Sequence, residues 1–246
     1  MIKPDEDGRD RIYDVPQDEV RPFVFDSQVA SVFDDMIRRS VPGYGLTLQL
    51  ISSIASRLKH PVRVYDLGCS LGAGMASADR GMAGSGVEIV GIDTSDSMLS
   101  RANEHLSACG MAHPFQLIRA DVCDYTLLQH NLCLLNFTLQ FVDPTQRGEL
   151  IRKIHDALLP GGYLILSEKI EFETVEEQEL QTDWHHAFKS LNGYSDLEIS
   201  QKRTSLENRL VPETRAAHVH RLRSAGFSQV VPWFQAFNFV SFVAVR

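Results

Sequence analysis

The sequence predicts an α/β fold with a mostly parallel sheet, and two patterns lead to this prediction. Short apolar runs alternate with amphipathic segments, and a polar or acidic residue follows each run. The runs cover residues 62–67, 87–92, 115–120, 132–137 and 163–166. Strands that are apolar throughout are buried on both faces, so we expect helices on both faces of the sheet. Ligands of such sheets bind at the carboxyl ends of the strands.

Two helices are expected before the first strand. Apolar residues recur at the spacing of one helical face between Val29 and Ile37, with Asp26 or Ser27 available as the N-cap. This helix should end before Pro42 and Gly43, and a second should run from about 46 to 58.

The helix after the fourth apolar run has clear boundaries. Asp143 caps it, Pro144 takes its first position and Gln146 completes a capping box. Its apolar face extends to Leu158, and the Leu-Pro-Gly-Gly stretch at 159–162 should end it.

The remaining segments complete a seven-stranded sheet. Residues from about 171 to 214 are polar and helical in pattern, so we expect a helical insertion there. The last two apolar runs, 229–235 and 238–245, are close enough to form an antiparallel hairpin at the sheet edge. Residues 1–22 are charged, contain three prolines and show no periodicity. We therefore expect a mobile N-terminal arm at 1–24 and a single domain at 25–246.

Composition excludes several classes of protein. The formal net charge of -8 argues against wrapping nucleic acid, which requires a concentrated basic face. The four cysteines form no CxxC pair and have no histidine at metal spacing, so we expect reduced thiols and no metal. No apolar run reaches the length of a membrane span, and the first residues lack the apolar segment of a signal peptide, so we expect a cytoplasmic location.

The first strand leads into a turn typical of nucleotide-binding folds. Its sequence, Gly68-x-Ser70-x-x-Ala73, has serine where a dinucleotide fold uses glycine to admit a pyrophosphate. A ligand without phosphate tolerates that side chain. S-adenosylmethionine (SAM) is such a ligand, since it requires backbone amides, an acidic acceptor for its ribose hydroxyls and a partner for adenine.

Polar residues at three further strand ends fit the same ligand. Asp93 can accept hydrogen bonds from both ribose hydroxyls, Asp121 or its neighbouring backbone can contact adenine, and Asn136 faces the reactive end of a cofactor lying across the strands. Each has a purely structural alternative: Asp93 or Thr94 as a helix cap, and Asn136 as a turn residue. No general base follows Asn136, and the two prolines typical of aminomethylating enzymes are absent.

Basic residues provide weaker indications. Arg39, Lys169, Lys202 and Arg203 are candidates for binding an anionic substrate, although each alone is more typical of a solvated surface. Trp184, His185 and His186 receive no role, because two adjacent histidines lack further metal ligands.

Six motifs together resemble the carboxy-S-adenosyl-L-methionine synthase family, a relative of the class I methyltransferases with their Rossmann-like fold. They are SVPGY (40–44), YDLGCSLG (65–72), LNFTLQF (135–141), LSEK (166–169), NGYSxLEISQKR (192–203) and WFQxFNF (233–239). The resemblance covers about residues 25–246, and LNFTLQF and LEISQKR are its most specific parts.

The resemblance implies an activity and a set of site residues. The family combines SAM with prephenate and yields carboxy-SAM, phenylpyruvate and water, with the hydroxide lost by prephenate serving as the base. Cofactor contacts are implied at Tyr44, Gly68, Cys69, Ser70, Asp93, Thr94, Asp121, Val122 and Asn136. Thr94 departs from the family pattern, in which a relative has Asn at this position.

Further implications concern Arg203 and the partners. Arg203 is implied to bind the new carboxylate and so to act in catalysis. The resemblance also implies a homodimer without direct nucleic-acid binding, whose product passes to a tRNA wobble-uridine carboxymethyltransferase. Two alternatives remain open from the residues alone: an ordinary SAM-dependent methyltransferase acting on a small molecule, and a non-catalytic protein that binds SAM.

Overall fold

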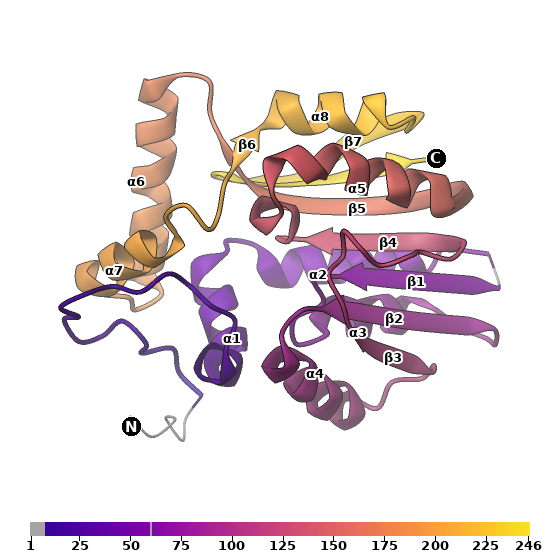
Figure 1. The fold of residues 1–246 in the computed structure, drawn as a ribbon, viewed down its shortest axis with the longest axis horizontal. Helices are drawn as coiled ribbons and strands as arrows, with labels where there is room; N and C mark the ends of the chain where they lie inside the picture. Colours follow the sequence, from indigo (N-terminus) through magenta and orange to yellow (C-terminus); the bar gives the residue numbers. More distant parts are fainter. Residues whose placement is uncertain (1–7, 60) are drawn as a thin grey trace.

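The computed structural model describes residues 8–59 and 61–246, and these form a single twisted sheet with helices on both faces (Figure 1). The strand order is β3-β2-β1-β4-β5-β8-β7, and the short β6 pairs with the end of β5. The strands are β1 (Val62–Leu67), β2 (Val87–Asp93), β3 (Phe115–Arg119), β4 (His130–Asn136), β5 (Leu158–Glu171), β6 (Glu213–Thr214), β7 (Gln229–Ala236) and β8 (Phe239–Val245).

Strands β1 to β5 are parallel, whereas β8 pairs antiparallel with both β5 and β7. The predicted mostly parallel sheet with an antiparallel C-terminal hairpin is therefore confirmed. Strand β5 is longer than the expected run at 163–166, because Leu158 already pairs with His130 and Ile170 still pairs with Glu213. The Leu-Pro-Gly-Gly stretch thus lies inside the strand, and the preceding helix ends at Ala157.

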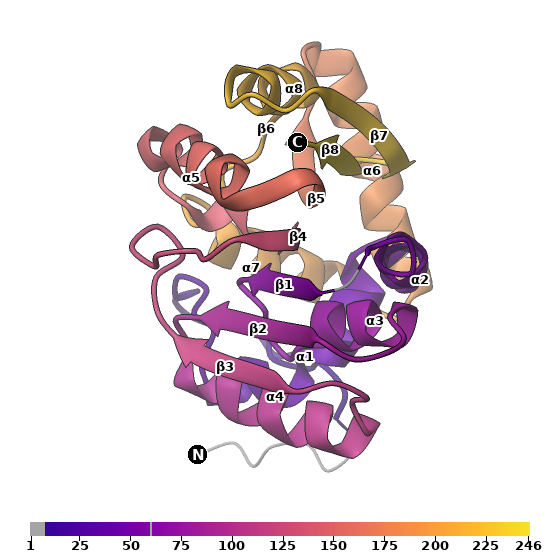
Figure 2. The same cartoon turned by 90° about the vertical axis from the view of Figure 1, so that its right-hand side faces the viewer.

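Helices cover the two faces of the sheet as predicted. They are α1 (Ser27–Ser40), α2 (Tyr44–Ala55), α3 (Ala73–Gly81), α4 (Asp96–Cys109), α5 (Pro144–Ala157), α6 (Val175–Leu191), α7 (Asp196–Leu206) and α8 (Arg215–Ser224), with a 3-10 turn at Leu139–Phe141. Figure 2 shows α5 on one side of the sheet and α2 and α3 on the other. Helix α2 begins two residues before the expected 46 and ends three before the expected 58.

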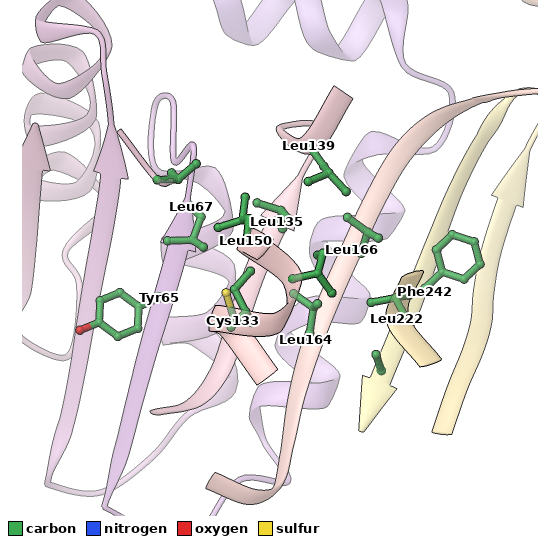
Figure 3. Packing of buried hydrophobic residues seen from close by; sticks show 14 of the residues in the cluster. Tyr65, Leu67, Cys133, Leu135, Leu139, Leu150, Leu164, Leu166, Leu222 and Phe242 are labelled. Atoms are coloured by element: carbon green, nitrogen blue, oxygen red, sulfur yellow. The ribbon is translucent and has the colours of Figure 1, made fainter. Parts of the chain in front are cut away.

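Two apolar clusters hold the layers together. On one face, Leu150 of α5 and Leu222 of α8 pack against the leucines of β4 and β5 (Figure 3). On the other face, Ile51 of α2 and Met75 of α3 pack against β1, β2 and β4. Strand β4 lies between these two clusters. Its side chains are therefore buried from Leu132 to Leu135 without a break.

The N-terminal segment differs from the expected mobile arm. Residues 1–7 lie outside the described residues, but 8–24 contact α1, α7 and the turn between α6 and α7. Asp10 is 1% exposed, accepts a hydrogen bond from the Tyr194 hydroxyl and lies 3.4 Å from the Lys202 ammonium. Gln17 and Phe23 donate backbone hydrogen bonds to residues of α7. The charges that indicated mobility in the sequence are here satisfied by partners distant in the chain.

Helices α1, α6 and α7 gather at one end of the sheet, the end toward which β1 and β4 run (Figure 1). The predicted insertion at about 171–214 contains α6 and α7. Arg147 of α5 binds the C-terminal end of this insertion. Its guanidinium is fully buried, pairs with Glu213 and donates hydrogen bonds to the carbonyl oxygens of Gln140 and Val211. The insertion is thereby held over the carboxyl ends of the strands.

Candidate functional site

A cavity of about 650 Å³ lies at the carboxyl ends of the parallel strands, where ligands bind in folds of this class. Nine of the ten predicted site residues line this cavity. They are Tyr44, Gly68, Cys69, Ser70, Asp93, Thr94, Asp121, Val122 and Asn136. Arg203 is the exception: its side chain is exposed on α7 and does not line the cavity.

The turn after β1 has the geometry of a nucleotide-binding turn. Gly68 has a φ of 74°, and a Cβ there would lie 2.3 Å from the Thr138 hydroxyl, so the close approach of LNFTLQF requires glycine. Ser70 also has a positive φ, 50°, which explains why related folds place glycine at this point. Its backbone N–H donates to Asp93 at 2.9 Å.

Asp93 connects the first two strand ends. One carboxylate oxygen accepts from Ser70 N–H, and the other accepts from Ser95 N–H at 2.9 Å. The cap of α4 is Ser95, whose hydroxyl accepts from Met98 N–H, so neither Asp93 nor Thr94 is the N-cap. Burial raises the pKa of Asp93 above its usual value, and its backbone donors partly offset this. The carboxylate thus remains at the cavity wall without a cationic partner among the described residues.

Asp66 is a cavity residue that the sequence reasoning missed. It lies three residues before the end of YDLGC, is 3% exposed and is within 2.5 Å of where a Cβ on Gly74 would stand. Burial, and then the neighbouring Asp93, raise the pKa of Asp66 to about 7. The signal was available, because an acidic residue inside an otherwise apolar strand next to a glycine turn is costly unless it faces a ligand.

The end of the cavity at β2 and β3 is more open. Asp121 is exposed and its carboxylate accepts from Cys123 N–H at 2.8 Å, while Val122 is buried. Thr94 is exposed. These residues form a rim at the ends of β2 and β3, as expected for the part of the site that holds the distal end of a ligand.

Asn136 is oriented from behind by two serines. Its side-chain oxygen accepts from the Ser167 hydroxyl at 2.9 Å, and that hydroxyl accepts from Ser241 at 2.7 Å. The three residues lie side by side on β4, β5 and β8. These hydrogen bonds fix the direction of the Asn136 side chain at the cavity wall.

The segment that follows Asn136 is hydrogen-bonded to Glu168 of the LSEK motif. Glu168 is fully buried and accepts from the N–H groups of Leu139 and Gln140 at 2.9 and 2.8 Å. Burial raises the pKa of Glu168 to about 8 against the effect of these donors. Phe137 is held at a φ of 58° within this segment, an unfavourable conformation for a residue with a side chain.

The opposite end of the cavity is basic. Lys169 of β5, Lys189 of α6 and Lys202 of α7 all contribute to its lining. Burial lowers the pKa of each, and the pKa of Lys189 falls to about 7. Of these, Lys189 was not among the residues considered from the sequence, since nothing in an amphipathic helix pattern marks one lysine as buried.

Other candidates have structural roles. Arg39 stacks over the Tyr194 ring at 3.8 Å and bonds the Asn192 carbonyl, away from the cavity. His185 is buried with its Nε2 2.8 Å from the Ser40 carbonyl oxygen, and burial lowers its pKa to about 3, so it is neutral. The described residues contain no group of three or more acidic, histidine or cysteine side chains suited to a metal ion.

The lining fits SAM. Its acidic end offers Asp66 and Asp93 to a ligand that carries an ammonium group, a sulfonium and ribose hydroxyls, and neither carboxylate is paired with a cation of the described chain. The turn at 68–70 admits a ligand without a pyrophosphate. Asp121 and Val122 lie at the third strand end, where the adenine is expected.

Comparison with known proteins identifies the family. Residues 64–162 match a model described as a methyltransferase domain. Carboxy-S-adenosyl-L-methionine synthase from Shewanella halifaxensis is 48% identical over 238 residues, which are 96% of this chain and 98% of that protein. The enzyme of the same name from Pseudomonas aeruginosa is 47% identical, with the same coverage. The chain belongs to the carboxy-S-adenosyl-L-methionine synthase family.

Solved structures of lower identity agree in fold. A putative O-methyltransferase from Nostoc punctiforme, 22% identical, superimposes with a TM-score of 0.63 over 89% of this chain and 59% of its own. Magnesium protoporphyrin IX methyltransferase from Synechocystis, 14% identical, gives 0.59 over 86% and 87%. As a carboxy-S-adenosyl-L-methionine synthase family member, the protein is a SAM-utilising enzyme on a class I methyltransferase fold. No helix within residues 8–59 and 61–246 has the length and apolar character needed to cross a bilayer.

Proposed function

We propose that the protein synthesises carboxy-SAM from SAM and prephenate and releases phenylpyruvate and water. The observation that carries this proposal is the charge arrangement of one cavity, acidic at the ends of β1 and β2 and basic at β5, α6 and α7. A cationic sulfonium ligand and a dianionic donor are therefore attracted to opposite ends and meet near Asn136. The close, full-length relationship to named carboxy-SAM synthases supports the same activity.

The reaction balances without a protein base. Prephenate loses carbon dioxide and hydroxide as its ring becomes aromatic. The hydroxide removes a proton from the SAM methyl group, whose acidity the sulfonium increases, and forms water. The resulting carbanion attacks the carbon dioxide, and the new C–C bond gives the carboxylate of carboxy-SAM. The protein's contribution is to hold both reactants together and exclude bulk water.

The residues have separate parts in this proposal. Asp93 accepts hydrogen bonds from the ribose hydroxyls, and Asp121 with Val122 contacts adenine. The turn formed by Gly68, Cys69 and Ser70 contacts the amino-acid portion, while Tyr44, Thr94 and Asn136 complete the SAM contacts. Tyr44 lies 6.4 Å from the Phe137 ring, and burial raises its pKa, so its hydroxyl remains protonated and able to donate.

Arg203 is proposed to bind the transferred carboxylate. Its guanidinium is exposed on α7, and its charge is among the causes that lower the pKa of Lys169, which lines the cavity. This proximity to a lining residue supports the proposed contact between Arg203 and a ligand at the basic end. We also propose a homodimer, a cytoplasmic location and transfer of the product to a tRNA wobble-uridine carboxymethyltransferase, with no tRNA bound by this acidic protein itself.

The test is an assay of the purified protein with SAM and prephenate, with mass spectrometry of the products and of any copurified ligand. We expect carboxy-SAM and phenylpyruvate in equal amounts. Copurification of SAM or its demethylated product alone, with no carboxy-SAM formed from prephenate, would instead indicate an ordinary methyltransferase. Sedimentation measures the proposed dimer independently.

A further inference from the structure

Two ammonium groups at the basic end of the cavity, those of Lys169 and Lys189, have no hydrogen-bond acceptor among residues 8–59 and 61–246. Lys189 is 9% exposed and Lys169 is partly buried, and within the described chain neither forms a hydrogen bond or ion pair. Lys202, beside them, is different: its ammonium lies 3.4 Å from Asp10 and 3.1 Å from the Ser40 hydroxyl. Of the three lysines that line this end of the cavity, only Lys202 forms an ion pair within the described residues.

Burying a cation without a partner is costly, and two unpaired lysines of the described residues, Lys189 buried and Lys169 partly buried, line the same cavity. Removing an ammonium from water without pairing it is unfavourable, and like charges nearby add to the cost. Lys189 is subject to both effects. Burial is the main cause that lowers its pKa, and the positive charges of Lys202 and Lys169 lower it further. A ligand with two negative charges would remove this cost at both positions.

We infer that Lys189 and Lys169 bind the two carboxylates of the carbon dioxide donor, Lys189 the pyruvyl carboxylate and Lys169 the ring carboxylate that is transferred. This inference rests on the proposed function, because it takes prephenate as the donor. It deepens that function by naming the residues that select a dicarboxylate.

The sheet register supports the allocation of the two carboxylates. Ser167 pairs with Asn136, and Lys169 follows two residues later on the same strand and so on the same face. Lys169 is thus the lysine next to the position proposed for the SAM methyl group, and it is also the one whose pKa Arg203 lowers. Lys189 comes from α6, outside the sheet, and is left for the carboxylate that stays with the product.

Three aromatic side chains line the cavity together with these lysines. The strained Phe137 ring is 6.4 Å from Tyr44 and 6.0 Å from Phe239, and all three residues line the cavity. Backbone strain persists only where the surrounding structure enforces it, and it clusters at ligand sites. An apolar surface next to two cations matches a ligand with an apolar ring and two carboxylates.

The test compares Lys189→Met, Lys169→Met and Lys59→Met in the full-length protein. Methionine preserves the length of the side chain and removes its charge, and Lys59 is an exposed lysine outside the cavity. We expect each cavity variant to raise the KM for prephenate about ten- to a hundredfold, the loss typical of one charge-assisted hydrogen bond. The dissociation constant for SAM should change less than twofold, and Lys59→Met should behave as wild type.

Phenylpyruvate separates the roles of the two lysines, because it retains the pyruvyl carboxylate and lacks the other. Its inhibition constant against prephenate should rise tenfold or more in Lys189→Met and stay within twofold of wild type in Lys169→Met. Lys189→Arg, which keeps a cation, should recover much of the prephenate affinity.

The pH profile gives a second readout. Charged and titratable groups act on Lys189 from α6, β5, α7 and the N-terminal segment. They are His185, His186, Lys169, Lys202 and Asp10. The ammonium form of Lys189 is required, and its pKa in the free protein is about 7. The kcat/KM for prephenate should therefore fall as pH rises above about 7. Lys189→Arg should lose this fall, because arginine stays protonated.

The outcomes separate this inference from the proposed function. A wild-type protein that forms no carboxy-SAM from prephenate would show that the function itself is wrong. If the wild type is active but the methionine variants keep its KM for prephenate, the lysines are not the binding groups. Equal losses of SAM and prephenate affinity, or equal effects of both variants on phenylpyruvate, would also overturn the inference.

Discussion

The two ends of the cavity differ in how the chain builds them. The acidic end comes from consecutive strand–turn units. Asp66 lies inside β1 and Asp93 ends β2, whereas Gly68 and Asp121 lie in the turns after β1 and β3, and all four line the cavity. The basic end combines β5, two helices of the insertion and the N-terminal segment, with Asp10 compensating Lys202 across 192 positions of the chain.

This difference separates the part of the site that is common to the fold from the part that is particular to this family. The acidic end is made of turns and strand ends that class I methyltransferase folds share, and the family model for a methyltransferase domain matches only residues 64–162. The basic end lies almost wholly outside that range. Binding of SAM is therefore expected to depend on one half of the site, and choice of the second reactant on the other.

The largest expected effect concerns the stability of the basic end. The pKa of Lys189 is lowered from 10.5 to about 7, so wild-type unfolding takes up a proton between these values and stability rises with pH across that window. Lys189→Met removes the buried charge and should raise the free energy of unfolding at pH 7 by up to about 4 kcal/mol. Denaturant unfolding at several pH values measures this.

The gain should shrink toward zero as pH approaches about 10, because the unfolded lysine then also loses its proton. Lys59→Met is the control, since that lysine is exposed. A gain that does not depend on pH would mean that better packing, and not the removal of a buried charge, stabilises the variant.

Asp93→Ala tests the acidic end. It removes an acceptor for the ribose hydroxyls and should weaken SAM binding by about 1.5 to 3 kcal/mol for each bond lost, less any compensation by water. It also leaves the N–H groups of Ser70 and Ser95 without their acceptor, so the melting temperature should fall. Calorimetry with SAM measures the first effect.

The matched control is Asp96→Ala, which removes a neighbouring carboxylate that is exposed at the start of α4. It should keep the affinity for SAM. Unchanged affinity in Asp93→Ala would reduce Asp93 to its structural hydrogen bonds.

Arg203→Lys tests the basic end of the cavity by comparing the affinities for SAM and carboxy-SAM. A guanidinium binds a carboxylate by two parallel hydrogen bonds, whereas lysine offers one point charge. Affinity for carboxy-SAM should fall by about 1 to 3 kcal/mol, and affinity for SAM should fall much less. Titrations with both ligands decide this, with the exposed Arg215→Lys on α8 as control. Equal losses would assign Arg203 to the shared part of the ligand or to the fold.

The smallest effect is expected for Ser70→Gly. The residue already has a φ of 50°, so glycine relieves strain of about 1 kcal/mol, and its greater freedom in the unfolded chain offsets a similar amount. Stability and SAM affinity should stay near wild type, and no NAD binding should appear. Tight binding of NAD to the wild-type protein, measured by calorimetry, would contradict the assignment of SAM to this turn.

The sequence by itself determined the fold and, apart from Asp66, the residues that line the acidic end. Strand and helix periodicity reflects burial of each element, and a parallel strand places its final residue at the same edge as its neighbours, so Gly68, Asp93, Asp121 and Asn136 could be brought together on paper. Local signals also marked the N-terminus of α5 at Asp143. Family resemblance added the reaction, which no periodicity contains.

Only the tertiary structure decided the basic end. The burial of Lys189, the pairing of Lys202 with Asp10 and the packing of residues 8–24 all depend on contacts between segments far apart in the chain. A charged residue has the same sequence signature whether it is solvated or enclosed, since the pattern shows which face of a helix is apolar but not what later covers its polar face. Burial of charge is set by the docking of elements, and it became visible only when α6, α7 and the N-terminal segment were placed over the ends of the strands.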